Sequence, residues 1–269
     1  MADRYTYITL IGLFVIIAWG ANDLLSKWLR RKIWLGTLAA IILPVLIVLT
    51  WKQVQYWEDS ITLYKHTLKH TSNNVHIHNN LGNVLKKQGR TEEAIKHYLQ
   101  ALRSNPDYAG AHLNLGNAYY ESGKTKKAIG SYKQAIRINP DYADAYSNLG
   151  NAYYESGMHK EAIDAFQQAI RANPDDADAH NYLGVAYAKS GKRREATEAY
   201  KQALRINPDD AQTHYNLGVA YGALGKYQEA TEAFKQAIRI NPDYAGAHYN
   251  LGYTYVLSND RDSALEQYK

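Results

Sequence analysis

The chain has 269 residues, of which 46% are hydrophobic and 21% charged, and its formal net charge is +5. It contains no cysteine, which excludes a disulfide framework, a thiolate zinc site and a cysteine nucleophile. Residues 1–74 hold 8 Lys and Arg against 4 Asp and Glu, whereas residues 75–269 hold 23 against 22. Because this larger region lacks the basic surface that nucleic acid requires, we predict no nucleic-acid partner.

Two segments near the N-terminus, residues 5–22 and 33–51, contain no charged residue. Each is long enough to cross a hydrocarbon core of about 30 Å as a helix. The loop between them, residues 23–32, carries Lys27, Arg30, Arg31 and Lys32, and short loops this basic stay in the cytoplasm. We therefore predict a transmembrane hairpin over residues 1–51, integral to the inner membrane, with the rest of the chain extracytoplasmic (periplasmic). The alternatives are a signal peptide over residues 1–21 and two core helices of a soluble domain.

Residues 52–74 separate this hairpin from a repetitive region. The segment from Tyr56 to Thr67 has the register of a single second helix of the repeats that follow. We predict that residues 52–74 form a degenerate helix that caps the array.

From residue 75 onward the sequence repeats every 34 residues. The recurring residues are a glycine, an alanine, an aromatic residue and a proline: Gly82, Gly116, Gly150, Gly184, Gly218 and Gly252; Ala94, Ala128, Ala162, Ala196, Ala230 and Ala264; Tyr98, Tyr132, Phe166, Tyr200, Phe234 and Tyr268; Pro106, Pro140, Pro174, Pro208 and Pro242. This period resembles the tetratricopeptide repeat (TPR), a pair of antiparallel helices per unit. The predicted fold class is all-α: a two-span transmembrane hairpin followed by a TPR α-solenoid, a right-handed superhelix of helix pairs. Residues 75–269 hold six units, and the last is cut short at Lys269.

The repeated residues have physical roles within each unit, which we number from seven residues before its first glycine. Glycine at position 8 and alanine at position 20 let the two helices approach closely, and the aromatic at position 24 fills the remaining space. A second glycine, such as Gly157, ends the first helix, and Asn-Pro ends the second. The acidic pairs Asp175-Asp176 and Asp209-Asp210 are predicted to cap the next helix.

A ladder of histidines stands at position 4 of five units: His78, His112, His180, His214 and His248. They lie one repeat apart, too far to share a metal ion at about 2.0–2.1 Å, so we assign them to packing. The sequence holds no serine elbow, zincin helix or dinucleotide-binding glycine motif. We predict no catalytic residue, no metal and no cofactor.

The exposed face of the first helices carries asparagines and tyrosines that are candidates for a peptide-binding groove. They are Asn80, Asn83, Asn114, Asn117, Asn148, Asn151, Asn216, Asn250, Tyr120, Tyr154, Tyr215 and Tyr249. An amide both donates and accepts, so a ladder of amides can pair with an extended peptide backbone. The repeats of O-linked N-acetylglucosamine transferase are similar there. The alternative is that these asparagines belong to the generic repeat consensus and serve the structure.

The segments Asp3-Arg4-Tyr5-Thr6-Tyr7-Ile8 and Thr50-Trp51 onward resemble the last membrane segments of bacterial relatives of the transmembrane and TPR-containing O-mannosyltransferases. In that family the catalytic acidic residues lie far upstream of the region that this chain resembles. The favoured interpretation is a membrane-anchored module that binds a protein or peptide in its concave groove. The alternatives are the C-terminal part of a glycosyltransferase whose repeats recruit acceptor proteins, and a structural spacer.

Overall fold

The computed structural model describes residues 31–55, 59–71 and 74–258, and the secondary structure of this part is entirely helical. Two compact units are distinguished, residues 1–66 and 67–269. The helices are α2 (Arg31–Gln55), α3 (Ser60–His70), α4 (Val75–Lys87), α5 (Thr91–Ser104), α6 (Ala109–Glu121), α7 (Thr125–Ile138), α8 (Ala143–Glu155), α9 (His159–Ala172), α10 (Ala177–Lys189), α11 (Arg193–Ile206), α12 (Ala211–Ala223), α13 (Tyr227–Ile240) and α14 (Ala245–Leu257).

The structure corrects the prediction of a two-span membrane hairpin. Across the three described ranges, no helix has both the length and the apolar character that crossing a bilayer requires. Helix α2 covers the second predicted span, but it runs from Arg31 to Gln55 and so extends past the uncharged segment at both ends. The first predicted span, residues 5–22, and the basic loop as far as Arg30 lie outside the described residues. The two-span hairpin is therefore wrong as a description of this fold.

Helix α3 lies within the predicted capping segment and begins at a side-chain cap. The Asp59 carboxylate accepts hydrogen bonds from the backbone N–H groups of Ile61 and Thr62 at 2.7 and 2.9 Å, and from the Thr62 hydroxyl at 2.6 Å. These bonds, the Thr62 hydroxyl first, hold the pKa of Asp59 below its usual value.

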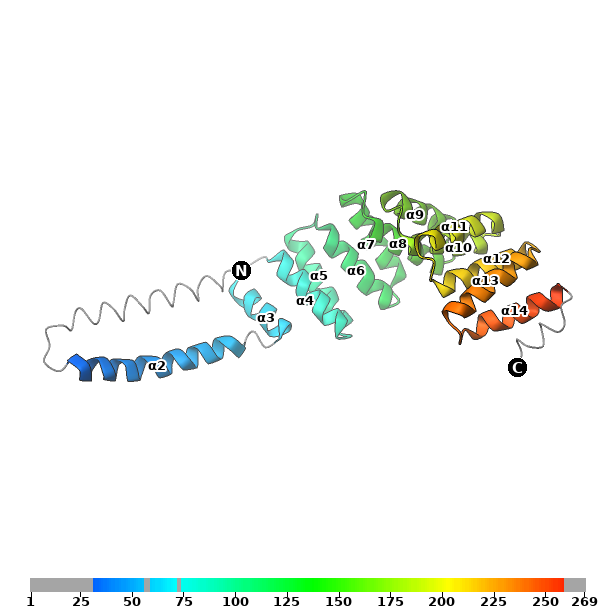
Figure 1. The fold of residues 1–269 in the computed structure, drawn as a ribbon. Coiled ribbons are helices and arrows are strands. Elements are labelled where there is room, and N and C mark those ends of the chain that lie inside the picture. The colour runs from blue at the N-terminus through cyan, green and yellow to red at the C-terminus, as the bar shows by residue number, and fades with distance from the viewer. Residues whose placement is uncertain (1–30, 56–58, 72–73, 259–269) are drawn as a thin grey trace. The chain divides into compact units, whose positions relative to one another are not determined.

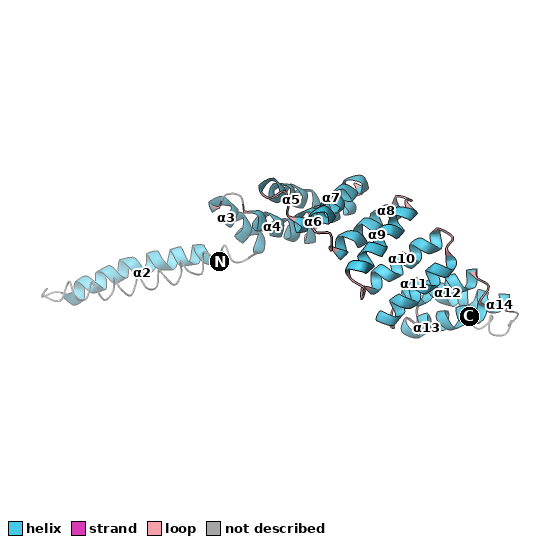
Figure 2. Ribbon diagram, turned by 90° about the horizontal axis from the view of Figure 1, so that it is seen from above, coloured by secondary structure: helices cyan, strands magenta, loops and turns pink. Residues whose placement is uncertain are grey.

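Residues 67–269 contain five complete helix pairs, from α4·α5 to α12·α13, and then α14 (Figure 1). Each pair packs within itself, and each second helix packs on the first helix of the next pair. Figure 2 shows the same succession from above. This confirms the predicted α-solenoid for the described repeats, while the second helix of the sixth unit lies outside the described residues.

The glycine at position 8 is explained by the aromatic ring that lies on it. A Cβ atom at Gly150 would come within 2.6 Å of the Phe166 ring, and one at Gly116 within 2.4 Å of the Tyr132 ring. Both rings are only 1% exposed. The aromatic side chain therefore occupies the space of the absent Cβ and joins the two helices of its own unit.

The helices begin and end at the glycine and aspartate residues predicted from the sequence. Gly157, with a φ of 75°, terminates α8 in a left-handed turn that favours glycine, and the Met158 N–H donates to the Tyr153 carbonyl at 2.9 Å. Asp176 caps α10 by accepting from the Ala179 N–H at 3.0 Å, and Asp210 caps α12 by accepting from the Gln212 N–H at 3.1 Å. The predicted caps are thus confirmed at the second aspartate of each pair.

The position-4 histidines hold the loops that precede their helices. In His112, His180, His214 and His248, Nε2 lies 2.9 to 3.1 Å from the carbonyl oxygen of the proline six residues earlier. Because a carbonyl only accepts, Nε2 carries the proton and donates. His78 has no such proline before it, and its Nδ1 instead lies 3.0 Å from Nδ1 of His97 on α5.

Candidate functional site

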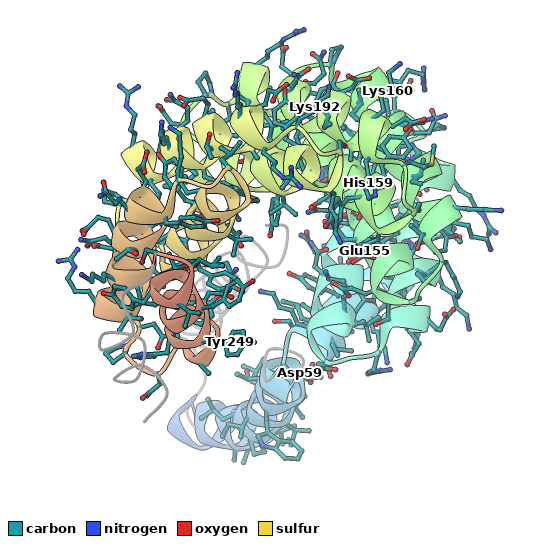
Figure 3. All side chains as sticks on the ribbon, turned by 90° about the vertical axis from the view of Figure 1, so that its right-hand side faces the viewer. Asp59, Glu155, His159, Lys160, Lys192 and Tyr249 are labelled. Atoms are coloured by element: carbon teal, nitrogen blue, oxygen red, sulfur yellow. The ribbon has the colours of Figure 1, made fainter. Side chains whose placement is uncertain are left out.

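The first helices of the repeats line the inner side of the curve that residues 67–269 follow (Figure 3). Glu155 on α8 and Tyr249 on α14 lie on this inner side, whereas Lys160 on α9 lies on the outer side. We call the surface of α4, α6, α8, α10, α12 and α14 on this side the concave face. The predicted peptide-binding residues are all on these helices.

Two hollows on the concave face bring several predicted residues together. The larger, of 330 Å³, lies over α6, α8 and α10 and is lined by Asn117, Asn148 and Asn151 together with Leu113, Asp144, Ser147, Asp176, Asp178 and Tyr182. The smaller, of 250 Å³, is lined by Asn117, Tyr120, Glu121, Tyr132, Asn148 and Asn151. Three asparagines are shared by both hollows, so repeats two to four form the most complete part of the candidate site.

The asparagines at position 6 are tied to the preceding repeat. Asn114 Nδ2 donates to Asn79 Oδ1 at 2.9 Å, and Asn216 Nδ2 donates to Asn181 Oδ1 at 3.2 Å. Asn250 donates in the same way to the Tyr215 hydroxyl at 2.9 Å, whereas Asn148 donates to Asn117 Oδ1, at position 9 of the preceding repeat, at 3.0 Å. One donor of each amide is therefore used to join neighbouring units, and these side chains serve the structure whether or not they also meet a peptide.

The asparagines at position 9 differ from repeat to repeat because the aromatic residue at position 24 differs. The Tyr98 hydroxyl donates to Asn83 Oδ1 at 2.8 Å, and the Tyr132 hydroxyl donates to Asn117 Oδ1 at 2.9 Å. In the third repeat the aromatic is Phe166, which has no hydroxyl. Asn151 lines both hollows, and within the described residues its side chain makes no hydrogen bond.

Carboxylates give the larger hollow a negative charge. Asp144, Asp176 and Asp178 line it, and among the described residues no ion pair involves any of them. In the smaller hollow, burial and a hydrogen bond to the Glu155 carboxylate raise the pKa of Tyr120. The concave face of repeats two to four is thus acidic and rich in amides.

The concave face becomes more aromatic toward the C-terminal repeats. Tyr249 is 62% exposed and Tyr253 52%. The Tyr215 ring packs against Tyr244, with 5.0 Å between the centroids, and the Tyr215 hydroxyl accepts a hydrogen bond from Asn250. Tyr215 therefore contributes to the packing of the repeats. Of the two predicted tyrosines in these repeats, Tyr249 is the more exposed.

Three features of the larger hollow were not predicted. Asp144 and Asp178 both stand at position 2, and the recurrence of an aspartate at this position is the sequence feature that could have indicated them. Ser147 lines the hollow with its Oγ buried and without a hydrogen-bond partner among the described residues. Tyr182 replaces asparagine at position 6, stacks on Phe166 with centroids 5.8 Å apart, and is 41% exposed.

The arrangement suits non-covalent recognition. Amides offer paired donors and acceptors, carboxylates attract cations, and tyrosine rings supply contact area. Asn80 is exposed on α4 at the N-terminal end of the array, and Tyr154 contacts His159 at 5.3 Å between ring centroids. These two predicted residues do not line either hollow.

The repeats match known proteins in sequence. The pattern of the family described as "Cilia and flagella-associated protein 70 C-terminal domain" matches residues 57–269. The human "Protein O-mannosyl-transferase TMTC1" (Homo sapiens) is 31% identical over 100 residues, which is 35% of this chain and 11% of that protein. The chain therefore spans about a tenth of the length of this curated relative.

Solved structures share the fold. MamA is 32% identical with a TM-score of 0.58, over 61% of this chain and 96% of that chain. YrrB, described as "a TPR protein with an unusual peptide-binding site", is 26% identical with a TM-score of 0.60, over 68% of this chain and 95% of that chain. Since the family pattern extends from residue 57 to the last residue, the chain belongs to the tetratricopeptide-repeat family of the cilia and flagella-associated protein 70 C-terminal domain.

Proposed function

We propose that this chain is a protein-interaction module that binds an extended peptide segment on the concave face of its repeats. The observation that carries the proposal is Asn151, an amide that lines two adjoining hollows and makes no side-chain hydrogen bond within the described residues. An extended peptide presents alternating N–H and C=O groups, which one asparagine can satisfy together. The peptide-binding site described for YrrB supports the same use of a similar fold.

The charge of the site favours a peptide that carries lysine or arginine. Asp144, Asp176 and Asp178 border the larger hollow, and opposite charges attract more strongly across a partly desolvated surface than in water. Binding should therefore weaken as salt is added, because ions screen such interactions over about 10 Å at 0.1 M.

The test is a selection of peptides from a random library on the full chain, followed by titration of an enriched peptide. Asn151→Ala removes a donor and an acceptor and should weaken binding by about two- to tenfold, as expected for about 0.5–1.5 kcal/mol. Gln168→Ala, on α9 of the same repeat, is the control and should leave the affinity unchanged. Equal affinities for both variants would contradict the proposal. Failure of every peptide to be enriched would likewise contradict it.

A second candidate function is the recruitment of acceptor proteins for a larger O-glycosylating enzyme. It is favoured by the 31% identity over 100 residues to the human "Protein O-mannosyl-transferase TMTC1". On this proposal the repeats hold the acceptor and the sugar-transfer chemistry belongs to other residues. Enriched peptides should then contain serine or threonine beside the bound segment. Peptides without either residue would count against it.

A further inference from the structure

On the outer side of the array, lysines cover tyrosines at most of the junctions between repeats. Lys133 lies over the Tyr153 ring at 5.6 Å, Lys201 over Tyr221 at 5.8 Å, and Lys235 over Tyr255 at 5.8 Å. In each case the lysine is at position 25 of one repeat and the tyrosine at position 11 of the next. The chain thus places an ammonium group on the same ring at three junctions, which is a cation–π interaction.

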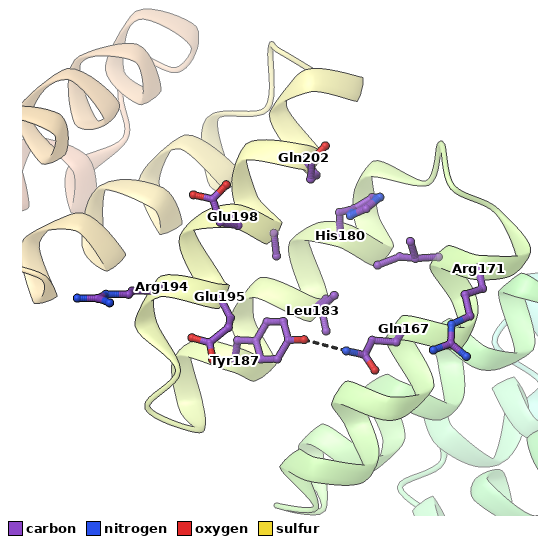
Figure 4. Close-up of a pocket in the computed structure, with 11 residues that line it drawn as sticks. Gln167, Arg171, His180, Leu183, Tyr187, Arg194, Glu195, Glu198 and Gln202 are labelled. Atoms are coloured by element: carbon purple, nitrogen blue, oxygen red, sulfur yellow. Dashed lines mark hydrogen bonds between the residues drawn. The ribbon is translucent and has the colours of Figure 1, made fainter.

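The junction between the third and fourth repeats lacks this lysine. Gln167 stands at position 25 there, and its Nε2 donates to the Tyr187 hydroxyl at 2.8 Å instead of covering the ring. A hollow of 630 Å³ remains between α9 and α11, with Ile170, Leu183 and Tyr187 among the residues that line it (Figure 4). Tyr221 has two lysines, Lys201 and Lys226, whereas among the described residues Tyr187 has only Lys192, at 5.7 Å.

The third junction still has the acidic residue that accompanies the lysine at the other junctions. Position 22 of the following repeat is acidic wherever position 25 is lysine: Asp164 with Lys133, Glu232 with Lys201, and Glu266 with Lys235. At the third junction Glu198 occupies position 22 and lines the hollow together with Glu195. Glu198 bonds the Nζ of Lys201 at 2.8 Å in an exposed pair, and two carboxylates together have room for a further cation.

The first junction shows the opposite combination. Leu99 replaces the lysine and Gly130 replaces the acid, and the hollow of 470 Å³ there is bordered by Arg103 and Lys127. That hollow has no carboxylate among its lining residues. The third junction therefore stands apart, because its tyrosine and its acidic residues are present while the lysine of position 25 is replaced by Gln167, and Lys192 is the one lysine over its ring among the described residues.

We propose that the hollow over Tyr187 is a second binding site, which receives a lysine or arginine side chain from a partner protein. The incoming cation takes the place that Lys133, Lys201 and Lys235 fill at the other junctions, with Glu195 and Glu198 beside it. The site is on the outer side and stands independently of the concave face.

Two arginines also line this hollow, and neither blocks the cation. Arg171 is at position 29, where arginine occurs in every complete repeat, including those that carry the lysine. Arg194 lines the hollow as well, and in Figure 4 its guanidinium group extends away from Tyr187 and His180.

The test is a titration of the full chain with a capped Gly-Lys-Gly peptide, read from the ring NMR signals of Tyr187 and Tyr221. The Tyr187 signals should shift saturably, and the lysine peptide should bind about two- to fivefold more tightly than its uncharged norleucine analogue. No shift at Tyr187, or equal affinity for the two peptides, would overturn the proposal.

Two variants make the test specific. Gln167→Lys supplies the chain's own cation and should abolish the Tyr187 response, with thermal unfolding as the check that the fold is retained. Lys201→Gln uncovers one side of Tyr221 and should make that ring respond to the lysine peptide. A response that persists in Gln167→Lys, or that does not arise at Tyr221 in Lys201→Gln, would show that the missing lysine does not define a site.

Discussion

At the scale of single residues, the same asparagine has different roles according to the ring that faces it. Asn117 accepts from the Tyr132 hydroxyl and from Asn148, so two repeats depend on one oxygen. The aromatic residue in the repeat of Asn151 is Phe166, which has no hydroxyl, and Asn151 lines the two hollows without a side-chain hydrogen bond among the described residues. A repeat consensus would treat both positions alike.

This difference predicts opposite effects of alanine on stability. Asn117→Ala leaves the hydroxyl of the buried Tyr132 and the Asn148 amide without their acceptor, and should lower the free energy of unfolding by about 1–3 kcal/mol. Asn151→Ala breaks no such bond and should change it by less than about 0.5 kcal/mol. Urea unfolding followed by circular dichroism measures both. Equal losses would mean that Asn151 is bonded within the fold.

The glycines of the array offer a second pair of residues. Gly150→Ala forces a Cβ atom into the space of the Phe166 ring, where 2.6 Å separates them, and should destabilise the fold by about 1–3 kcal/mol. Gly130, on α7, has nothing within 4 Å of the position that a Cβ atom would take, so Gly130→Ala should stabilise the fold by about 0.5–1 kcal/mol through helix propensity. Thermal unfolding of the two variants should move in opposite directions.

At the scale of elements, the helix boundaries could be predicted because each depends on residues next to it. Gly157 and the Asn-Pro pairs act within one turn, and the structure ends helices where they occur. The bonds between repeats could not be predicted in the same way. Asn148 reaches Asn117 across 31 residues, and whether an amide is free depends on a hydroxyl 15 residues away in the neighbouring helix.

The stability of the pair formed by α4 and α5 is expected to depend on pH. His78 and His97 approach to 3.0 Å between Nδ1 atoms, and burial lowers the pKa of His78 from its usual 6.5. The His78 imidazole therefore takes up its proton at a higher pH in the unfolded chain than in the folded chain. The contribution of neutral His78 to stability is present above pH 6.5 and is lost as the pH falls below this value.

The expected result is faster amide hydrogen exchange in α4 and α5 at about pH 5 than at about pH 8, after correction for the intrinsic exchange rate. His78→Tyr copies Tyr146, the residue at this position in the third repeat, and should flatten the pH dependence. An unchanged pH dependence in that variant would assign it to another group.

At the scale of the whole array, each helix pair contacts its neighbours and no distant pair among the described repeats. Stability in such a chain is a sum of local and nearest-neighbour contributions. Gly82→Ala, which forces a Cβ to within 2.5 Å of the Tyr98 ring, should therefore accelerate hydrogen exchange in α4 to α6 and leave α12 and α13 unchanged. Uniform acceleration in all helices would indicate one cooperative unit.

The exchangeability of the units has a consequence for shortened forms of the chain. Excision of residues 143–176 removes one period and joins α7 directly to α10. Lys133 would then stand where Gln167 now stands, ahead of Tyr187, and the outer hollow would close while Asn151 is lost. Loss of this particular repeat would therefore leave a continuous solenoid without either proposed binding surface, and duplication of this repeat would duplicate both.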